Sequence, residues 1–305
     1  MGLFDKQKEP IFLKTDSEAE KQLAALRKLR GSRTGESAAR LSQEMRMVEA
    51  GIAGEERIRF ELENSHMPMY VLHDLFLERD SLTAQIDYLI ITPYDQFVLE
   101  CKNLFGNIEI NERGDFIRTF AFGGESKKEG IYSPVTQNRR HLDLIRQIRG
   151  DTKGNFISKA FFEKNFYDTY RSLIVLANPK TVVNMKQAPR DIQAQVIRAD
   201  QLITHIRKAS ENRSDRMSDK NTEELANFFL NAHRPQNIDY FAKYRKMFPS
   251  DTPKAASVKP ETEKVLCPKC GAPMVRRKAA KGENAGREFY GCSRYPKCRG
   301  IINIK

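Results

Sequence analysis

Three charged residues lie where a short β-hairpin would bring them together. Asp87 belongs to one apolar run, and Glu100 and Lys102 belong to the next. If residues 92–95 form a four-residue turn, with proline at its second position, Asp87 faces Glu100 directly. Their Cβ atoms would then lie ~5 Å apart, and a register slip of two would place Asp87 opposite Lys102 instead. The hairpin therefore predicts a cluster of Asp87, Glu100 and Lys102 on one face.

This cluster has the composition of a metal-dependent phosphodiesterase site. Two close carboxylates repel each other unless a cation joins them, and Mg²⁺ or Mn²⁺ accepts carboxylate, carbonyl and water oxygens. The Cys101 carbonyl offers a third ligand. A lysine beside such a metal can activate a water and stabilise charge on a phosphate. An ordinary surface Glu-x-Lys pair has the same spacing, so that reading stays open. Alternation turns the Cys101 side chain to the other face, where it is expected to pack in the core.

Four cysteines near the end of the chain form a second constellation, with the spacing C-x2-C-x21-C-x5-C. In a chain without a secretion signal, a Cys-x-x-Cys cluster favours metal binding over a disulfide. Four thiolates suit a closed tetrahedral Zn²⁺ site, which we predict to be structural. The predicted ligands are Cys267, Cys270, Cys292 and Cys298.

The same module carries most of the chain's positive charge. Residues 265–305 hold ten Lys or Arg and two Glu, so they contribute +8 to the net charge of +12. Cationic side chains favour phosphate contacts, and aromatic rings between them can stack on bases. The predicted nucleic-acid contacts are Arg276, Arg277, Lys278, Arg287, Phe289, Tyr290, Arg294, Tyr295 and Lys297. A ribbon used only for stability or protein contact is the alternative.

These residues need a scaffold of strands and helices. Residues 1–50 look polar and helical, and we interpret them as a helical N-terminal extension. Residues 51–248 alternate strand and helix signals, which predicts an α/β domain with a mixed β-sheet flanked by helices. A helix is expected to begin after Ser133, with proline in its first turn. Residues 249–264 read as a proline-containing linker, and 265–305 as a small zinc ribbon.

Membrane and secreted classes are disfavoured by the sequence. The longest apolar runs fall far short of the ~20 residues that a membrane span needs. The first residues lack the apolar region of a signal peptide. We therefore expect a cytoplasmic protein without a membrane partner.

The hairpin and its surroundings resemble the nuclease-related domain (NERD) family. The resemblance rests on the strings QIDYLIIT and FVLECKNLFGNI, on Gly54-Glu55 upstream and on PVTQ from Pro134 to Gln137, and its motif core spans 51–165. It implies a restriction-endonuclease-like fold. By the same resemblance, Asp87 and Glu100 bind Mg²⁺ and Lys102 assists the attacking water.

The resemblance also assigns two supporting residues. Glu55 would support the metal or a water, and Gln137 would orient a water or a phosphate. Glu55 could instead be a solvated helix carboxylate, and Gln137 a helix-capping or surface amide. His141, one turn beyond Gln137, could face the same cleft, but we expect it on the helix surface. His73 has no partner pattern and stays unassigned.

The cysteine module resembles the C4 zinc ribbons of bacterial type I topoisomerases. The phrases CPKCGAPMVRRK and FYGCSRYPKCRG carry this similarity. It implies binding of single-stranded DNA. The leading hypothesis is a metal-dependent nuclease that acts on DNA and holds it with the ribbon. An inactive nucleic-acid-binding adaptor and an RNA-directed nuclease are the alternatives.

Overall fold

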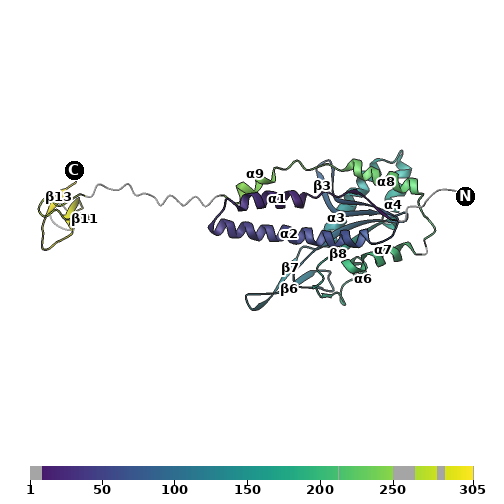
Figure 1. Cartoon of the computed structure of the whole chain (residues 1–305), viewed down its shortest axis with the longest axis horizontal. Helices are drawn as coiled ribbons and strands as arrows, with labels where there is room; N and C mark the ends of the chain where they lie inside the picture. Colours follow the sequence, from purple (N-terminus) through teal and green to yellow (C-terminus); the bar gives the residue numbers. More distant parts are fainter. Residues whose placement is uncertain (1–8, 212, 250–264, 280–285, 305) are drawn as a thin grey trace. The chain divides into compact units, whose positions relative to one another are not determined.

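The computed structural model describes residues 9–211, 213–249, 265–279 and 286–304. The chain divides into two compact units, Met1–Ser250 and Asp251–Lys305 (Figure 1). The predicted linker 249–264 lies outside the described residues except for Pro249. Among the helices of the described ranges, none combines the length and apolar character needed to cross a bilayer.

A six-stranded mixed sheet forms the centre of the first unit, in the order β1-β2-β3-β4-β8-β10. The β2–β3 and β3–β4 pairs are antiparallel, whereas the β1–β2, β4–β8 and β8–β10 pairs are parallel. The predicted mixed α/β architecture is thus confirmed. The strands are Pro10–Lys14 (β1), Met69–Arg79 (β2), Leu82–Ile91 (β3), Gln96–Lys102 (β4), Tyr170–Leu176 (β8) and Val196–Arg198 (β10).

Helices cover both faces of this sheet, which explains why β2 and β4 are apolar along most of their length. On one face, Ile58 of α2 and Leu202 of α7 pack with Tyr88 and Leu99. The opposite face carries α3 and α8, with Ile145 among the buried residues. The helices are Glu18–Arg30 (α1), Gly35–Glu63 (α2), Pro134–Asp151 (α3), Phe156–Lys164 (α4), Phe166–Thr169 (α5), Arg190–Gln193 (α6), Leu202–Ser210 (α7), Asp219–Ala232 (α8) and Tyr240–Met247 (α9), with a 3-10 turn at Ala199–Gln201 (η1).

The described part of the first fifty residues packs more closely on the domain than the polar helical extension that the sequence predicts. Strand β1 extends the central sheet alongside β2. Helix α1 buries Leu26 and Leu29 against α2 and α9, where Tyr244 completes a small core. Helix α2 then runs without a break through residue 50. The polar composition does not predict this packing, because the few buried leucines lie among many charged residues in the sequence.

A second sheet follows the candidate hairpin in the chain, in the order β7-β6-β5-β9. It packs on the end of β8 through Ile174 and Leu176. Strands β6 and β7 form the arm visible below α2 in Figure 1. The strands are Asn107–Ile110 (β5), Phe116–Phe122 (β6), Glu125–Ile131 (β7) and Val183–Asn184 (β9).

The second unit is a small antiparallel sheet in the order β11-β12-β13. Its buried centre holds Cys267, Ala272 and Cys292, which is a very small core for an independent unit. A bound metal therefore has to supply much of its folding free energy. The strands are Met274–Lys278 (β11), Glu288–Cys292 (β12) and Ile301–Asn303 (β13).

Candidate functional site

The hairpin of β3 and β4 has the register that the sequence predicts. The turn at 92–95 closes with a 2.9 Å backbone hydrogen bond. The last pair of the ladder joins Tyr88 to Leu99. The next positions are Asp87 and Glu100, which therefore face each other at the point where regular pairing stops.

The two carboxylates differ in exposure, since Glu100 is buried and Asp87 is half-buried, and their negative charges lie close together. Asp87 Oδ2 accepts a 2.6 Å hydrogen bond from the backbone N–H of Cys101. Glu100 is 2 % exposed, and its Oε1 accepts a 2.5 Å bond from Lys102 Nζ. Burial raises the pKa of Glu100 although Lys102 lowers it. Burial, then the charges of Glu100 and Glu55, raise the pKa of Asp87 well above its usual range. Lys102 thus compensates only part of the negative charge of the two carboxylates, since its ion pair is with Glu100.

One oxygen at this site has no partner. Glu100 Oε2 is buried and makes no hydrogen bond within the described residues. A hard divalent cation between Asp87 and Glu100 would satisfy this oxygen and relieve the repulsion between the two carboxylates. The donor set therefore fits Mg²⁺ or Mn²⁺, with Asp87 and Glu100 as its carboxylate ligands.

Helix α3 brings two more side chains to the same face. Its first turn is capped by the Ser133 side chain, and Gln137 Oε1 accepts a 3.3 Å bond from Lys102 Nζ. His141 lies one turn further on, with Nδ1 3.8 Å from Glu100 Oε2. It is 8 % exposed, so the expectation of a surface histidine was wrong. Burial, and then the charge of Lys102, lower its pKa to about 4. The ring is therefore neutral at pH 7.

Glu55 reaches the site from the other side of the sheet. It lies on α2, and its Oε2 is 2.8 Å from Nε2 of His73. The hydroxyl of Tyr88 donates to its backbone carbonyl over 3.0 Å. Within the described residues, no hydrogen bond joins Glu55 to Asp87 or Glu100, although its charge raises the pKa of both. Glu55 thus affects the pair through its charge and not through a hydrogen bond.

A glycine lets α2 approach the end of β4. A Cβ atom built on Gly54 would lie 2.6 Å from Asn103 Cβ and 3.1 Å from Cys101 Sγ. Real Cβ atoms essentially never come as close as the first distance, and the second is tighter than most Cβ contacts. The Cys101 side chain lies on this helix-covered face with the core residues, as alternation predicts. Glycine at position 54 therefore sets how closely Glu55 can stand to the hairpin.

The four ribbon cysteines form a separate, compact ligand set. Their Sγ atoms all lie within 4.8 Å of one another, and the Cys267–Cys298 and Cys270–Cys292 separations are 3.7 and 3.5 Å. A tetrahedron with Zn–S bonds of ~2.3 Å has edges of about 3.8 Å. Backbone N–H groups, first that of Lys269, lower the pKa of Cys267 to about 7 and favour its thiolate. The four cysteines can therefore hold a zinc ion.

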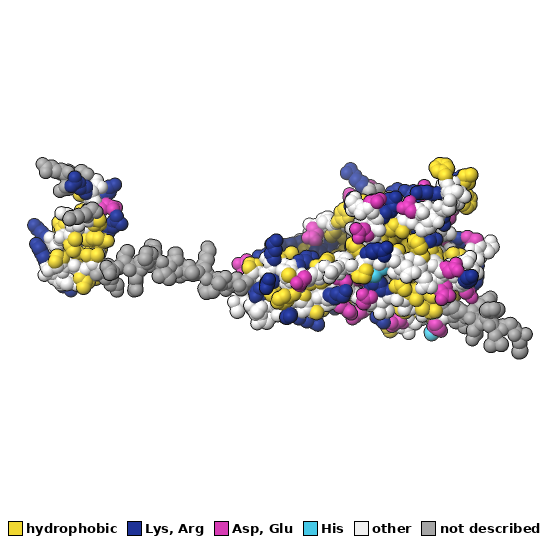
Figure 2. All heavy atoms as spheres, turned by 90° about the horizontal axis from the view of Figure 1, so that it is seen from above, with side chains coloured by type: hydrophobic (Ala, Val, Ile, Leu, Met, Phe, Trp, Pro, Cys, Tyr) yellow, Lys and Arg dark blue, Asp and Glu magenta, His cyan; other side chains and the backbone are white. Residues whose placement is uncertain are grey.

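The predicted nucleic-acid contacts divide between the two faces of the ribbon sheet. Arg277 pairs with Phe289, on the face opposite to Cys292 and Met274. Its guanidinium lies 5.9 Å from the ring of exposed Tyr295. The other face carries Tyr290, Lys278 and Arg276, and the last is ion-paired with Glu288. Figure 2 shows lysine and arginine side chains around a hydrophobic patch of this unit.

Family comparisons agree with both sites. Residues 50–177 match the family model described as nuclease-related domain, and residues 264–305 match that of the topoisomerase DNA binding C4 zinc finger. The chain carries a nuclease-related domain and a topoisomerase-type zinc ribbon. Neither the curated proteins nor the solved structures contain a match. The two matches indicate nucleic-acid binding.

The nuclease-related domain contains every residue predicted for the hairpin site. Its match begins five residues before Glu55 and ends at Ala177, just beyond β8. Sequence reasoning left His73, in the same domain, unassigned, but its ring contacts the Glu55 carboxylate. A signal for it existed, because residues 80–81 form a two-residue turn between β2 and β3 that pairs His73 with Tyr88. That register places His73 one position away from Asp87 across the sheet.

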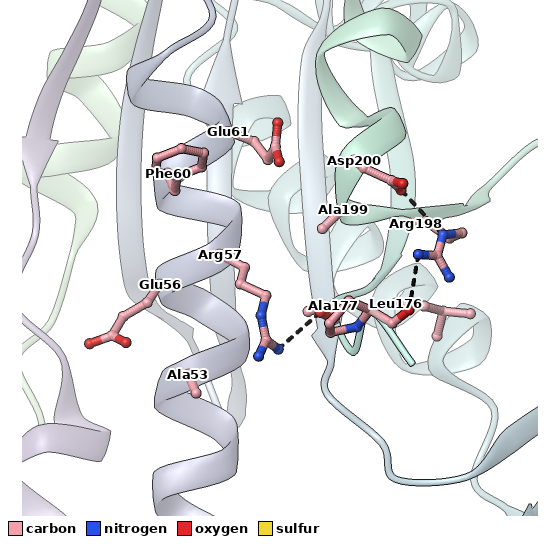
Figure 3. Close-up of a pocket in the computed structure, with 11 residues that line it drawn as sticks. Ala53, Glu56, Arg57, Phe60, Glu61, Leu176, Ala177, Arg198, Ala199 and Asp200 are labelled. Carbon is pink, nitrogen blue, oxygen red and sulfur yellow. Dashed lines mark hydrogen bonds and ion pairs between the residues drawn. The ribbon is translucent and has the colours of Figure 1, made fainter. Parts of the chain in front are cut away.

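A hollow lies beside the domain's site but does not contain it. It encloses about 350 Å³ between α2 and the ends of β8 and β10 (Figure 3). Arg57 crosses it and donates to the Ala177 carbonyl over 3.1 Å and to Asn103 Oδ1 over 3.2 Å. Arg198 is similarly tied to the Thr181 carbonyl. Arg57 therefore braces α2 against the end of β8, whereas Arg198 ties β10 to the loop after β8, so the hollow has a structural explanation.

Proposed function

We propose that the protein is a metal-dependent nuclease that acts on DNA, with its centre at Asp87, Glu100 and Lys102. The observation that carries the proposal is that half-buried Asp87 faces buried Glu100, which has one unpartnered oxygen and lies directly beside a lysine. A metal bound there would act as a Lewis acid toward a phosphate oxygen and increase the acidity of a water. The restriction-endonuclease-like fold implied by the NERD resemblance is consistent with this use.

The remaining residues have distinct roles in this proposal. Asp87 and Glu100 hold the metal, and the Cys101 N–H fixes the orientation of the Asp87 carboxylate through its 2.6 Å bond. Lys102 donates a hydrogen bond to a water or phosphate oxygen, and its contact with Gln137 orients the Lys102 ammonium group. Gln137 also orients the water or phosphate. Glu55 adds negative charge behind the metal, which favours cation binding.

We further propose that the ribbon binds single-stranded DNA. Its face with Arg277, Phe289 and Tyr295 combines a cation with rings that can stack on bases. Exposed Arg294 and Lys297 add charge for phosphates. The predicted linker 249–264 would tether this module to the nuclease-related domain and raise the local substrate concentration.

A DNA-binding adaptor is the second candidate, and one observation favours it. Lys102 already forms a 2.5 Å ion pair with Glu100, which partly neutralises the carboxylate pair without a metal. In that case the nuclease-related domain would only position DNA that the ribbon binds.

A paired cleavage assay decides between the candidates. Wild type and Lys102→Ala are incubated with single-stranded DNA, double-stranded DNA and RNA, with and without added Mg²⁺ or Mn²⁺. The metal-free samples are desalted rather than treated with EDTA, because a chelator also removes zinc from the ribbon. Lys220→Ala is the control, since that side chain is 83 % exposed and lies on α8.

We expect Mg²⁺- or Mn²⁺-dependent DNA cutting that Lys102→Ala reduces by at least about 100-fold, whereas Lys220→Ala cuts like wild type. Cutting that persists in Lys102→Ala would place the activity elsewhere. If neither protein cuts but both bind DNA, the adaptor takes the place of the nuclease. Preferential cutting of RNA would change the substrate class.

A further inference from the structure

His73 is the residue in closest contact with the Glu55 carboxylate. Its Nε2 lies 2.8 Å from Glu55 Oε2, and its Nδ1 lies 3.3 Å from the backbone carbonyl of Thr15. The ring stacks on Tyr88 with centroids 4.6 Å apart. Both side chains of the pair are largely buried, with 10 % of His73 and 19 % of Glu55 exposed. The pair is therefore a shielded hydrogen bond rather than a surface ion pair.

The two neighbours of the ring fix its orientation. A carbonyl can only accept a hydrogen bond, so the Nδ1 atom that faces Thr15 carries a hydrogen. An ionised carboxylate also only accepts, so the bond between Nε2 and Glu55 needs one further hydrogen, carried by Nε2 or by the Glu55 carboxyl group. A ring flip would break both contacts. The Thr15 carbonyl therefore determines which nitrogen faces Glu55.

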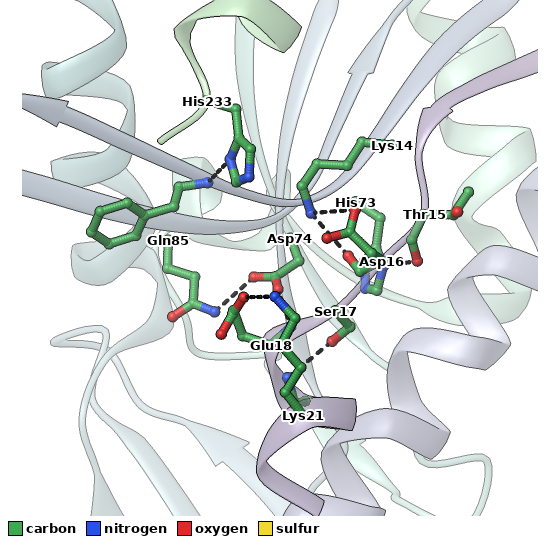
Figure 4. Close-up of polar contacts among 12 residues, drawn as sticks. Lys14, Thr15, Asp16, Ser17, Glu18, Lys21, His73, Asp74, Gln85 and His233 are labelled. Atoms are coloured by element: carbon green, nitrogen blue, oxygen red, sulfur yellow. Dashed lines mark hydrogen bonds and ion pairs between the residues drawn. The ribbon is translucent and has the colours of Figure 1, made fainter. Parts of the chain in front are cut away.

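The backbone around Thr15 is itself held by the neighbour of His73 in the sequence. Asp74 adopts a left-handed conformation with φ 50°, and its Oδ2 accepts a 2.5 Å bond from the N–H of Glu18. Its Oδ1 accepts a 2.7 Å bond from Gln85. Figure 4 shows these contacts at the start of α1, with Thr15 close to His73. Asp74 thereby fastens the turn between β1 and α1 to strand β2.

We infer that His73 is a positioning residue for Glu55, and that residues 15–18 complete the nuclease site from outside the matched domain. The inference rests on the proposed function, because it assigns a role within the same site. Histidine partners of this kind orient a carboxylate through a second hydrogen bond of their own. The hydroxyl of Tyr88 holds the Glu55 backbone, so His73 controls the remaining freedom of its side chain.

Three substitutions at His73 separate positioning from packing. Glutamine can place an amide N–H near the Nε2 position and keep a donor toward Glu55. Asparagine is shorter and keeps a donor only toward Thr15, whereas phenylalanine keeps only the ring on Tyr88. We expect His73→Gln to cut DNA within about threefold of wild type. His73→Asn and His73→Phe should lose roughly 10–100-fold. If His73→Phe retains activity and His73→Gln does not, stacking matters and the inference is wrong.

A background variant tests whether His73 acts through Glu55. Glu55→Gln removes the carboxylate that His73 is proposed to orient. Adding His73→Phe to this variant should lower the cleavage rate by less than about twofold, because the two effects are not additive for residues that act together. A further loss of tenfold or more would show an independent role for His73.

Unfolding measurements test the pair even if the protein cuts nothing. Urea unfolding of the zinc-loaded chain, without Mg²⁺ or Mn²⁺, is compared for wild type, His73→Phe, Glu55→Gln and the double variant. We expect a coupling of about tenfold in the unfolding equilibrium constant. Additive effects within twofold would overturn the inference. Coupling in a protein without cleavage activity would instead reject the nuclease proposal and retain the contact.

The chain provides a matched control for this cycle. His66 Nδ1 lies 3.0 Å from Glu9 Oε1, but 77 % of His66 and 62 % of Glu9 are exposed. An exposed pair contributes little because water screens it. The His66→Phe and Glu9→Gln cycle should therefore show coupling below about twofold. Equal coupling in both cycles would mean that the His73–Glu55 contact is no stronger than an exposed surface pair.

Discussion

Gly54→Ala tests whether the distance between α2 and the hairpin controls the site. The added Cβ would lie 2.6 Å from Asn103 Cβ, whereas carbon atoms in contact stay about 3.5–4.0 Å apart. The helix must therefore move by roughly 1 Å at this position. Glu55 is the next residue and moves with it, which stretches its 2.8 Å contact with His73. A displacement of this size can reduce catalysis by about 100-fold.

The same substitution has two opposing effects on stability. Replacing a helical glycine with alanine stabilises a helix by about 1 kcal/mol, whereas overpacking costs roughly 1–3 kcal/mol. The net change in the free energy of unfolding thus lies between about 0 and 2 kcal/mol destabilising. Gly51 provides the control, because a Cβ there meets nothing within 4 Å and it lies one turn earlier on α2. Gly51→Ala should gain about 1 kcal/mol.

Two measurements on the same samples check this reasoning. Urea unfolding should place Gly54→Ala about 1–3 kcal/mol below Gly51→Ala, which is the overpacking cost alone. Cleavage with Mg²⁺ should fall about 100-fold in Gly54→Ala and stay at the wild-type rate in Gly51→Ala. If the two variants have equal stability, α2 is not in close contact with β4. If the stabilities differ as expected but the two variants cleave DNA at the same rate, the position of Glu55 does not limit the reaction.

Two further predictions concern the ribbon and the helix that follows β10. Removing zinc with a chelator, or replacing Cys267 with serine, should unfold 265–304 and lower affinity for single-stranded DNA. The free energy of unfolding of the first unit should change by less than about 0.5 kcal/mol, because it shares no zinc ligand. Circular dichroism and DNA titrations with measured zinc content check this, and unchanged DNA affinity in zinc-free protein would contradict it. Burial lowers the pKa of His205, with Arg171 and Lys208 acting in the same direction. Since the unfolded chain then binds the proton more readily, stability should fall as pH drops through the ordinary value of about 6.5. Urea unfolding at pH 7.5 and 5.5 should show a smaller fall in His205→Phe, and equal falls would show that His205 does not contribute.

The hairpin could be predicted because local rules determine it. A four-residue turn and strict alternation fix which residues face each other, and the structure has that register. The cysteine ligands were equally predictable, since their spacing alone indicates a metal site. Strand β7 could not be predicted in this way. Its residues are nearly all exposed, and only its pairing with β6 makes it a strand.

Hydrophobic periodicity also failed where polar side chains are buried. It predicts the face of α3 with Leu142 and Ile145, and both are buried. Neighbouring Asn138 and His141 are buried as well. The face of α3 that contacts the sheet is therefore wider than the stripe formed by its apolar residues. Asn138 donates to the Val98 carbonyl over 2.7 Å and fixes α3 on β4. Contacts of this kind depend on tertiary packing and have no local signature.

Two buried side-chain atoms near the hairpin make no hydrogen bond within the described residues. Burying a polar atom without a hydrogen bond costs about 1–3 kcal/mol, and Glu100 Oε2 and His141 Nδ1 are both in this state 3.8 Å apart. A neutral ring with a hydrogen on Nδ1 could donate to that oxygen only after a small rotation. A cation bound by Glu100 and Asp87 would instead satisfy the oxygen directly and oppose the pKa elevation of both carboxylates. Burial, like charge and an unused acceptor thus coincide at the hairpin. Such a site destabilises the folded chain unless a ligand binds there, which is the physical reason to seek the metal at this position.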